Sequence, residues 1–313
     1  MRPRFDIVGR RGWFFSLSLA ITIAGLIPLL VFGFNLGTDF KAGSQIQLAV
    51  NQPFDTRTVA QVMAKAGVQV PAGSVSVAGL NDATAMIRFP EVLSLSQQAS
   101  ITKETKVAFP NSSFQINTVD PFVAQQTSRI AVWAVLMASL FIAIYVLVRF
   151  EYRFSAAALV ALLHDVFIVM SAFALLRLEV NLSFVAAVLT IVGYSINDTI
   201  VIFDRIRENL KLEPPKSYPE LSALVNKSLW QTMTRSLNTV ATVLLAALML
   251  FFFGGQSIHD FTFALTVGLI SGAYSSIFIA SPLWVLWYGR KFREKSPIGT
   301  GIGTGKGKGM DLF

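Results

Sequence analysis

The sequence predicts an α-helical membrane protein with six transmembrane helices and one small α+β domain outside the membrane. Hydrophobic residues make up 53% of the chain and charged residues only 14%, which is more apolar and less charged than a typical soluble domain. Six apolar runs are long enough to cross a hydrocarbon core that needs about 20 residues. Between the first two runs, about 80 residues alternate short strand-like and helix-like patterns instead.

Composition excludes several kinds of functional site. The chain has no cysteine, so disulfides, thiol nucleophiles and cysteine-based metal sites are ruled out. Its two histidines, His164 and His259, are too few for a histidine-built metal site. The net charge of +8 comes from basic residues that gather beside the apolar runs. Such clustering indicates membrane topology rather than binding to nucleic acid.

The first apolar run, from Trp13 to Phe34, follows a basic start that contains Arg10 and Arg11 as well as Arg2 and Arg4. A cleavable signal peptide has an apolar region of roughly 7 to 15 residues and a small-x-small cleavage site. Neither feature is present, so we expect an uncleaved membrane anchor.

Five further runs predict the remaining spans, at about Ile130 to Val148, Ala156 to Leu176, Leu182 to Phe203, Leu237 to Phe253 and Phe261 to Trp287. Lys and Arg concentrate in the 149–155 and 204–235 segments and in the tail, whereas the 177–181 and 254–260 loops hold one arginine between them. The positive-inside rule therefore predicts that both termini are cytoplasmic.

The predicted organisation has four parts. They are residues 1–36, a cytoplasmic N-terminus and the first span; 37–127, an extracytoplasmic domain; 128–288, spans two to six with a cytoplasmic loop at about 205–230; and 289–313, a basic, glycine-rich cytoplasmic tail.

The extracytoplasmic domain has a recognisable order of elements. The predicted elements are a strand at 44–50, a helix capped by Asp55 and followed by Gly67, strands at 73–79 and 83–89 around a turn at Gly79, Asn81 and Asp82, a helix from Ser94 to Val107, and a strand from Phe114 to Val119. The order β-α-β-β-α-β is that of a ferredoxin-like domain. No catalytic cluster appears in it, so we expect a binding or leverage module.

Asp198 lies inside the fourth apolar run. An ionised aspartate in hydrocarbon costs several kcal/mol, so such residues usually face a bundle interior and mark an ion or proton path. Two alternatives stay open: Asp198 reaches the membrane interface, or it is a neutral, hydrogen-bonded structural acid.

Other polar residues fall at similar depths. At the helical rise of 1.5 Å per residue, His164 and Asp165 lie roughly 12 to 14 Å from the cytoplasmic end of span three, and Asp198 lies roughly 10 to 13 Å from the same side. If span five begins in the helical stretch near Leu229, Arg235 lies roughly 9 Å inside that start. An arginine beside Asp198 would hold it ionised, and protonation of Asp198 would release the arginine. We therefore predict a proton relay of Asp198, Arg235 and Asp165.

Three further polar side chains are expected to support this relay. Tyr194 and Asn197 share the Asp198 stripe, and His164 pairs with Asp165 or bonds a backbone carbonyl. Small residues in membrane helices serve packing more often than ion transfer. We therefore expect Gly193, Gly268 and Gly272 to be packing sites.

Residues 193–209 read GYSINDTIVIFDRIREN and resemble the signature of the SecD/SecF family of bacterial protein export. Supporting matches are Gly37 to Gly43, His164 with Asp165, and Thr234 to Ser236. Ala42 departs from the family pattern, which more often has glycine there. The resemblance covers nearly the whole chain.

The resemblance implies one six-helix half of a resistance-nodulation-division type bundle in the bacterial inner membrane, with SecD supplying the other half. It implies a role in late steps of preprotein translocation through the SecYEG channel, driven by the proton gradient after the SecA motor has acted. Asp198 and Arg235 would respond to protons, together with an acid from SecD. Protons would be the coupling ion, with no cofactor and no enzymatic activity. YajC, YidC and membrane lipid are further implied partners, and nucleic acid is not.

Two other functions remain open. In an intramembrane aspartyl protease, Asp165 and Asp198 would share a proton, although the chain has Ser195 to Asp198 where presenilin-like enzymes show Gly-x-Gly-Asp. The second alternative is half of a proton-driven exporter of small molecules or lipids. The small outer domain argues against a self-contained drug pump.

Overall fold

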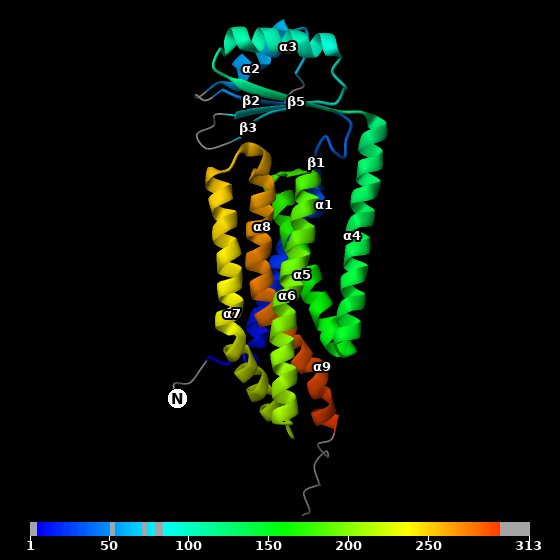
Figure 1. Cartoon of the computed structure of the whole chain (residues 1–313), viewed down its shortest axis with the longest axis vertical. Helices are drawn as coiled ribbons and strands as arrows, with labels where there is room; N and C mark the ends of the chain where they lie inside the picture. The colour runs from blue at the N-terminus through cyan, green and yellow to red at the C-terminus, as the bar shows by residue number, and fades with distance from the viewer. Residues whose placement is uncertain (1–4, 51–53, 71–73, 79–83, 295–313) are drawn as a thin grey trace, which may run out of the picture.

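The computed structural model describes residues 5–50, 54–70, 74–78 and 84–294. Helices form an elongated bundle, and a small α+β domain lies across one end of it (Figure 1). In the described part of the chain, six helical segments are long and apolar enough to span a membrane, as predicted. Arg2, Arg4, the turn at 79–82 and the tail at 295–313 lie outside the described residues.

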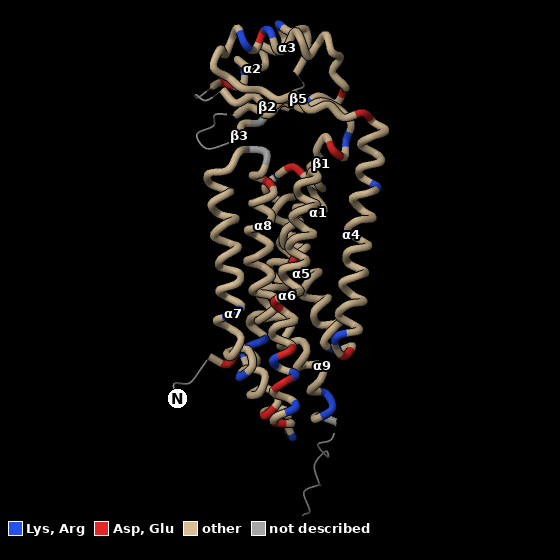
Figure 2. Tube along the Cα trace, in the orientation of Figure 1, with Lys and Arg blue, Asp and Glu red and all other residues tan. Residues whose placement is uncertain are grey.

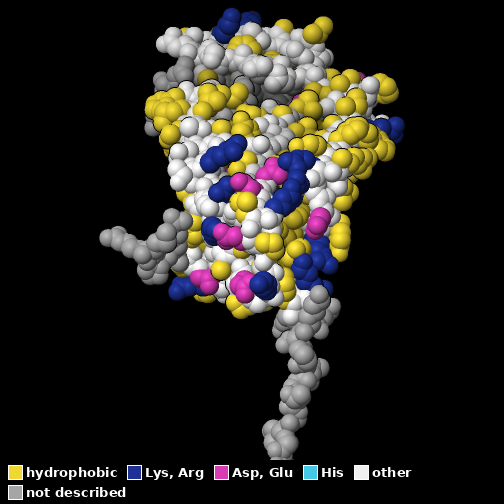
Figure 3. Space-filling view, turned by 60° about the horizontal axis from the view of Figure 1, so that its bottom comes forward, with side chains coloured by type: hydrophobic (Ala, Val, Ile, Leu, Met, Phe, Trp, Pro, Cys, Tyr) yellow, Lys and Arg dark blue, Asp and Glu magenta, His cyan; other side chains and the backbone are white. Residues whose placement is uncertain are grey.

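The helices of the bundle extend the predicted runs. They are α1 (Arg11–Phe32), α4 (Pro121–Arg149), α5 (Tyr152–Leu176), α6 (Leu182–Leu212), α7 (Tyr218–Phe253) and α8 (Gln256–Ser275), which continues through a π-helical turn (Ser276–Ala280) into α9 (Ser281–Glu294). Apolar side chains cover the flanks of the bundle (Figure 3), and many basic and acidic residues gather at the end away from the outer domain (Figures 2 and 3).

The structure corrects the cytoplasmic loop expected at about 205–230. Helices α6 and α7 continue through most of it and leave only residues 213–217 between them. Arg205 and Glu208 form an ion pair of 2.7 Å on α6, and Asn209 donates to Ser228 of α7 at 2.7 Å. Side-chain pairs of this kind stabilise a helix after its apolar run has ended. Hydropathy showed where the apolar run ends but not where the helix ends.

The outer domain has the predicted order of elements. They are β2 (Gly43–Ala49), α2 (Thr56–Lys65), β3 (Val75–Ala78), β4 (Thr84–Phe89), α3 (Leu95–Ala108) and β5 (Ser113–Val119). Asp55 caps α2 by accepting from the Arg57 amide at 2.9 Å, and Ser94 caps α3. The four strands are antiparallel to their neighbours in the order β3-β4-β2-β5.

The sheet of the outer domain has one apolar and one polar face. Because side chains alternate along a strand, Ile46 and Leu48 of β2 enter the domain core, while Gln45 and Gln47 line a hollow on the opposite face. Both helices lie on the side of the sheet away from the bundle (Figure 1). The polar hollow has a volume of about 220 Å³ and also contains Asp260 of α8, so the polar face is turned towards the bundle.

A short ribbon that the sequence did not predict joins the domain to the bundle. Strand β1 (Asn35–Leu36), after α1, pairs in parallel with β6 (Glu179–Val180), between α5 and α6. Glu179 is buried and forms an ion pair with Arg88 of β4. Gln45 Nε2 donates to Glu179 at 3.0 Å, and Arg88 donates to Asn35 at 3.0 Å. These four residues, the junction cluster, fix the sheet to the outer ends of α1, α5 and α6.

Candidate functional site

Asp198 lies on α6 inside the bundle and is only 7% exposed. Ser236 of α7 lies near the carboxylate, and Arg235 is the preceding residue on the same helix. Neither Asp198 Oδ2 nor Ser236 Oγ has a hydrogen-bond partner in the described part of the chain. Buried polar atoms almost always have a hydrogen-bond partner. The unpartnered oxygen of Asp198 is therefore unusual and calls for an explanation.

Arg235 lies one residue before Ser236, on the face of α7 that is exposed in the single chain. Within the described ranges it forms no ion pair. The structure therefore brings Asp198 and Arg235 to adjacent helices without closing a salt bridge. That arrangement leaves the cation free to respond to the charge of the carboxylate.

Asp165 has very different surroundings. It is fully buried on α5, and its oxygens accept hydrogen bonds from Ser195 at 2.6 Å, Ser271 at 2.7 Å and Ser275 at 2.7 Å. His164 Nδ1 also lies 3.2 Å from Asp165 Oδ1. Because Ser195 belongs to α6 while Ser271 and Ser275 belong to α8, this single carboxylate ties three helices together.

The serines around Asp165 were missed by sequence reasoning, as was the π-helical turn that follows them. The available signal was the spacing of Ser271 and Ser275. They are four positions apart, so they lie on the same face of a helix. In the turn, Ser276 Oγ lies 2.8 Å from Thr199 Oγ1 of α6. Single π-helical turns occur frequently at functional sites, and this one adjoins the helix that carries Asp198.

The predicted supporting residues divide into two groups. His164 contacts Asp165 as expected, and its Nε2 is buried without a partner among the described residues. Tyr194 and Asn197 are exposed instead, on a face of α6 that no other part of the described chain covers. Because Asp198 itself is buried, it lies at the edge of that face.

Two of the three glycines pack as predicted. A Cβ at Gly268 would meet the Ile191 side chain, and one at Gly272 would lie 3.2 Å from Ser195 Cβ. Both therefore allow close approach of α8 to α6. A Cβ at Gly193 would meet nothing within 4 Å, so its packing role is not present within this chain.

The surroundings of Asp165 and Asp198 argue against the aspartyl protease alternative. Serine hydroxyls occupy the Asp165 carboxylate, and Asp198 is not among its partners. The close carboxylate pair needed for aspartyl protease chemistry is therefore absent between these two residues. Among the described residues, no group of three or more His, Asp or Glu side chains is placed to hold a metal ion.

Comparisons with known proteins show the family of the chain. Residues 98–290 match the family described as protein export membrane protein SecD/SecF, C-terminal, and residues 29–54 match the SecD/SecF GG motif. The chain belongs to the SecD/SecF family. The second match covers Gly37 to Gly43, the segment between α1 and β2, and the first covers the helices that carry Asp165, Asp198 and Arg235.

Relatives within the SecD/SecF family include both separate and fused chains. The protein translocase subunit SecF of Alicyclobacillus acidocaldarius is 56% identical over 94% of this chain and 96% of its own length. The SecDF of Bacillus subtilis is 41% identical over 94% of this chain but only 39% of its own length. The crystal structure of SecDF from Thermus thermophilus matches with a TM-score of 0.82 and 34% identity, over 92% of this chain and 39% of that one. The chain thus spans about two fifths of a SecDF protein.

Proposed function

We propose that this chain is a SecF-type subunit of the protein-export machinery and that it couples proton movement at Asp198 and Arg235 to late steps of preprotein translocation. The observation that carries the proton role is the pair itself. A buried carboxylate oxygen without a hydrogen-bond partner faces a helix whose arginine has no ion-pair partner in the described chain. Intramembrane charges arranged in this way mark proton and ion pathways.

A second six-helix half, supplied by SecD, is the proposed partner. The exposed face of α7 carries Arg235, Asn238, Thr239 and Thr242 at helical spacing, and Tyr194 and Asn197 are exposed on the neighbouring helix α6. Facing lipid, an arginine and two asparagines would be costly, so a protein surface or water must cover them. The fused SecDF relatives contain, beyond the matched part, about three fifths of additional chain, which is room for such a half.

The proposed coupling route runs along α6. Protonation of Asp198 would remove its attraction for Arg235 and change how α6 packs against α7. At the outer end of α6, the Leu182 amide donates to Asp39 at 2.9 Å, and the preceding Glu179 belongs to the junction cluster. A shift of α6 would therefore reach the outer domain through the β1–β6 ribbon and Arg88. Asp165 would act by positioning α6 against α5 and α8.

The same proposal includes the membrane location and the orientation of the chain. The bundle would span the bacterial inner membrane with both termini in the cytoplasm, because basic side chains gather at the end opposite the outer domain (Figures 2 and 3). The outer domain would then face the exported preprotein as it leaves the SecYEG channel. YajC and YidC are proposed as further partners, and protons as the only coupling ion, without enzymatic turnover.

The second candidate function is that of one half of a proton-driven exporter of small molecules or lipids, since such an exporter would use the same arrangement of charged residues on its transmembrane helices. The test that separates the two measures release of a preprotein from proteoliposomes that contain SecYEG, SecA, SecD and this chain. An imposed proton gradient should stimulate release with the wild-type chain. Asp198→Asn should insert normally and lose that stimulation, and Arg235→Leu should behave similarly. Release by Asp198→Asn at the wild-type, gradient-dependent rate would show that the proton assignment is wrong.

A further inference from the structure

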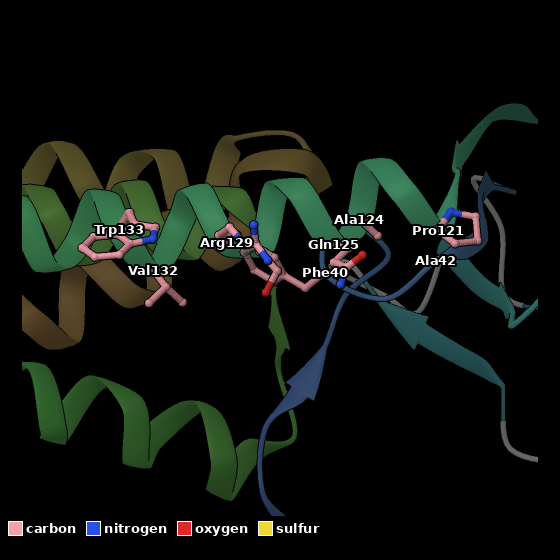
Figure 4. Close-up of a pocket in the computed structure, with 9 residues that line it drawn as sticks. Phe40, Ala42, Pro121, Ala124, Gln125, Arg129, Val132 and Trp133 are labelled. Carbon is pink, nitrogen blue, oxygen red and sulfur yellow. The ribbon is translucent and has the colours of Figure 1, made fainter.

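Two adjoining hollows lie along one face of α4, near the outer domain. The first, of about 490 Å³, is lined by Gln125, Ser128 and Arg129 at its polar part (Figure 4). The second, of about 310 Å³, is almost wholly apolar and extends between α4 and the pair α5 and α6. They share Phe40, Ser128 and Val132, so they form one groove with a polar mouth and an apolar interior.

The groove follows the helical periodicity of α4. Residues 125, 128, 129, 132 and 136 recur at spacings of three and four and therefore share one face. The polar members come first along the chain, and the apolar members follow. The opposite wall is apolar and consists of Met170 of α5 together with Phe184, Val185 and Val188 of α6. An occupant must therefore be polar at one end and apolar along the rest of its length.

Arg129 lies at the depth of lipid headgroups. The helical rise puts it about 30 Å from Arg149 at the other end of α4, which equals the thickness of a hydrocarbon core. Arg149 is already engaged, with Asp204 at 3.0 Å. Arg129 has neither an ion pair nor a side-chain hydrogen bond among the described residues. It therefore offers a free cation at the mouth of the groove.

Neither Asp39 nor Asp120 forms an ion pair with Arg129. Asp39 accepts from the Leu182 amide, and Asp120 accepts from the Phe122 amide, each at 2.9 Å. Both are thus engaged by helix N-termini. A net anion is the chemical complement of the mouth, and guanidinium groups bind phosphate well because they offer several donors in a fixed fork.

The apolar hollow is lined along α4 from Ser128 to Leu136, which is about 12 Å at the helical rise. A flexible acyl chain can follow this apolar strip between α4 and the α5–α6 pair. We propose that this groove binds one anionic glycerophospholipid, with its phosphate on Arg129 and an acyl chain between α4 and the α5–α6 pair.

Two measurements on the purified full-length chain test this site. Native mass spectrometry would titrate phosphatidylglycerol and phosphatidylcholine, and a phosphatidylglycerol with a photoreactive acyl chain would map the contacts. The wild type should retain one phosphatidylglycerol in preference to phosphatidylcholine, with adducts on α4 and on α5 or α6 peptides. Arg129→Gln should weaken that binding about tenfold, as expected for loss of a charge-assisted hydrogen bond, and Arg129→Lys should largely preserve it.

Arg177→Gln is the matched control, because Arg177 is another exposed arginine but bonds the backbone carbonyls of Phe32 and Gly33 and does not line the groove. It should bind lipid as the wild type does. If Arg129→Gln does not fold, Val185→Trp decides, because filling the groove should remove the acyl adducts. Equal binding of both lipids, unchanged binding by Arg129→Gln, adducts spread over the whole helical surface, or displacement of the lipid by added SecD would each overturn the proposal.

Discussion

Two buried aspartates of the bundle have opposite surroundings, and this difference assigns them different tasks. Three serine hydroxyls and a histidine surround Asp165, whereas one oxygen of Asp198 has no partner in the described chain. A fully bonded carboxylate resists change, because any change of its charge disturbs every donor around it. Asp165 therefore suits positioning, and Asp198 suits reversible proton binding.

Replacing Asp165 by Asn should destabilise the bundle by about 2 to 3 kcal/mol. Three serine hydroxyls donate to the carboxylate, and an amide, which has only one acceptor oxygen, cannot accept all three bonds equally well. The measurement is thermal unfolding of the purified chain in detergent. Asp198→Asn is the control and should unfold close to the wild type, since Asp198 Oδ2 has no hydrogen-bond partner to lose in the described part of the chain. Equal melting temperatures for Asp165→Asn and the wild type would contradict the positioning role.

Gly268→Ala should also destabilise the bundle, by about 1 to 3 kcal/mol, because the added methyl group would overlap Ile191. A double-mutant cycle with Ile191→Ala should show a favourable coupling energy, since the smaller side chain makes room for the methyl group. Gly193→Ala is the matched control, as nothing in this chain lies near its Cβ position. Strict additivity of the two changes would mean that this contact does not set the α6–α8 distance.

Several individual residues were predictable from sequence and others were not. Asp198 and Asp165 were visible because a charge inside an apolar run is rare, and Arg235 because the helical rise put it at a similar depth. Ser271 and Ser275 were not, because serine is common in membrane helices and only the fold shows that both point at Asp165. Tyr194 and Asn197 were expected to support Asp198 within the bundle, but they lie on the uncovered face of α6.

Among the elements, the junction between the outer domain and the bundle is the least expected. A two-residue strand such as β1 or β6 leaves no periodic pattern in a sequence, so sequence reasoning saw only loops there. The six spans and the β-α-β-β-α-β order were predictable because each rests on many residues. The π-helical turn was not, because it changes the backbone without interrupting the apolar run.

Removing the carboxylate of Glu179 should loosen this junction. Glu179→Ala leaves Arg88 and Gln45 without their shared acceptor, so amide hydrogen exchange should become faster in β1 and β6 and at the β4 end that holds Arg88. Exchange in the core strand β2 should change less. Glu91→Ala, at an exposed position of the same domain, is the control. Unchanged exchange in the ribbon would show that the ion pair does not fix the domain.

For the whole molecule, the uncovered polar face is the main sign that the chain works with a partner. An exposed arginine and asparagine stripe on α7 would be poorly placed against lipid. The fold of a single half was predictable from hydropathy and charge bias. The completed proton site was not, because part of its surroundings would come from SecD.

Cysteine cross-linking tests this interface in a chain that has no native cysteine. Asn238→Cys should cross-link to single cysteines in the transmembrane helices of SecD, because the polar face of α7 would lie against them. Leu30→Cys is the control, since Leu30 is 76% exposed on α1, a helix that packs mainly against α5. Equal cross-linking at both positions would argue against a specific interface there.

Proton flux is the most direct measure of the central claim, that Asp198 binds and releases the coupling proton. Proteoliposomes with this chain and SecD would carry a pH-sensitive dye inside, and an imposed gradient would start the flux. We expect the wild type to acidify the lumen faster than protein-free vesicles, Asp198→Asn to fall to the protein-free rate, and Thr190→Ala, elsewhere on α6, to behave as the wild type. Wild-type flux through Asp198→Asn would contradict the account.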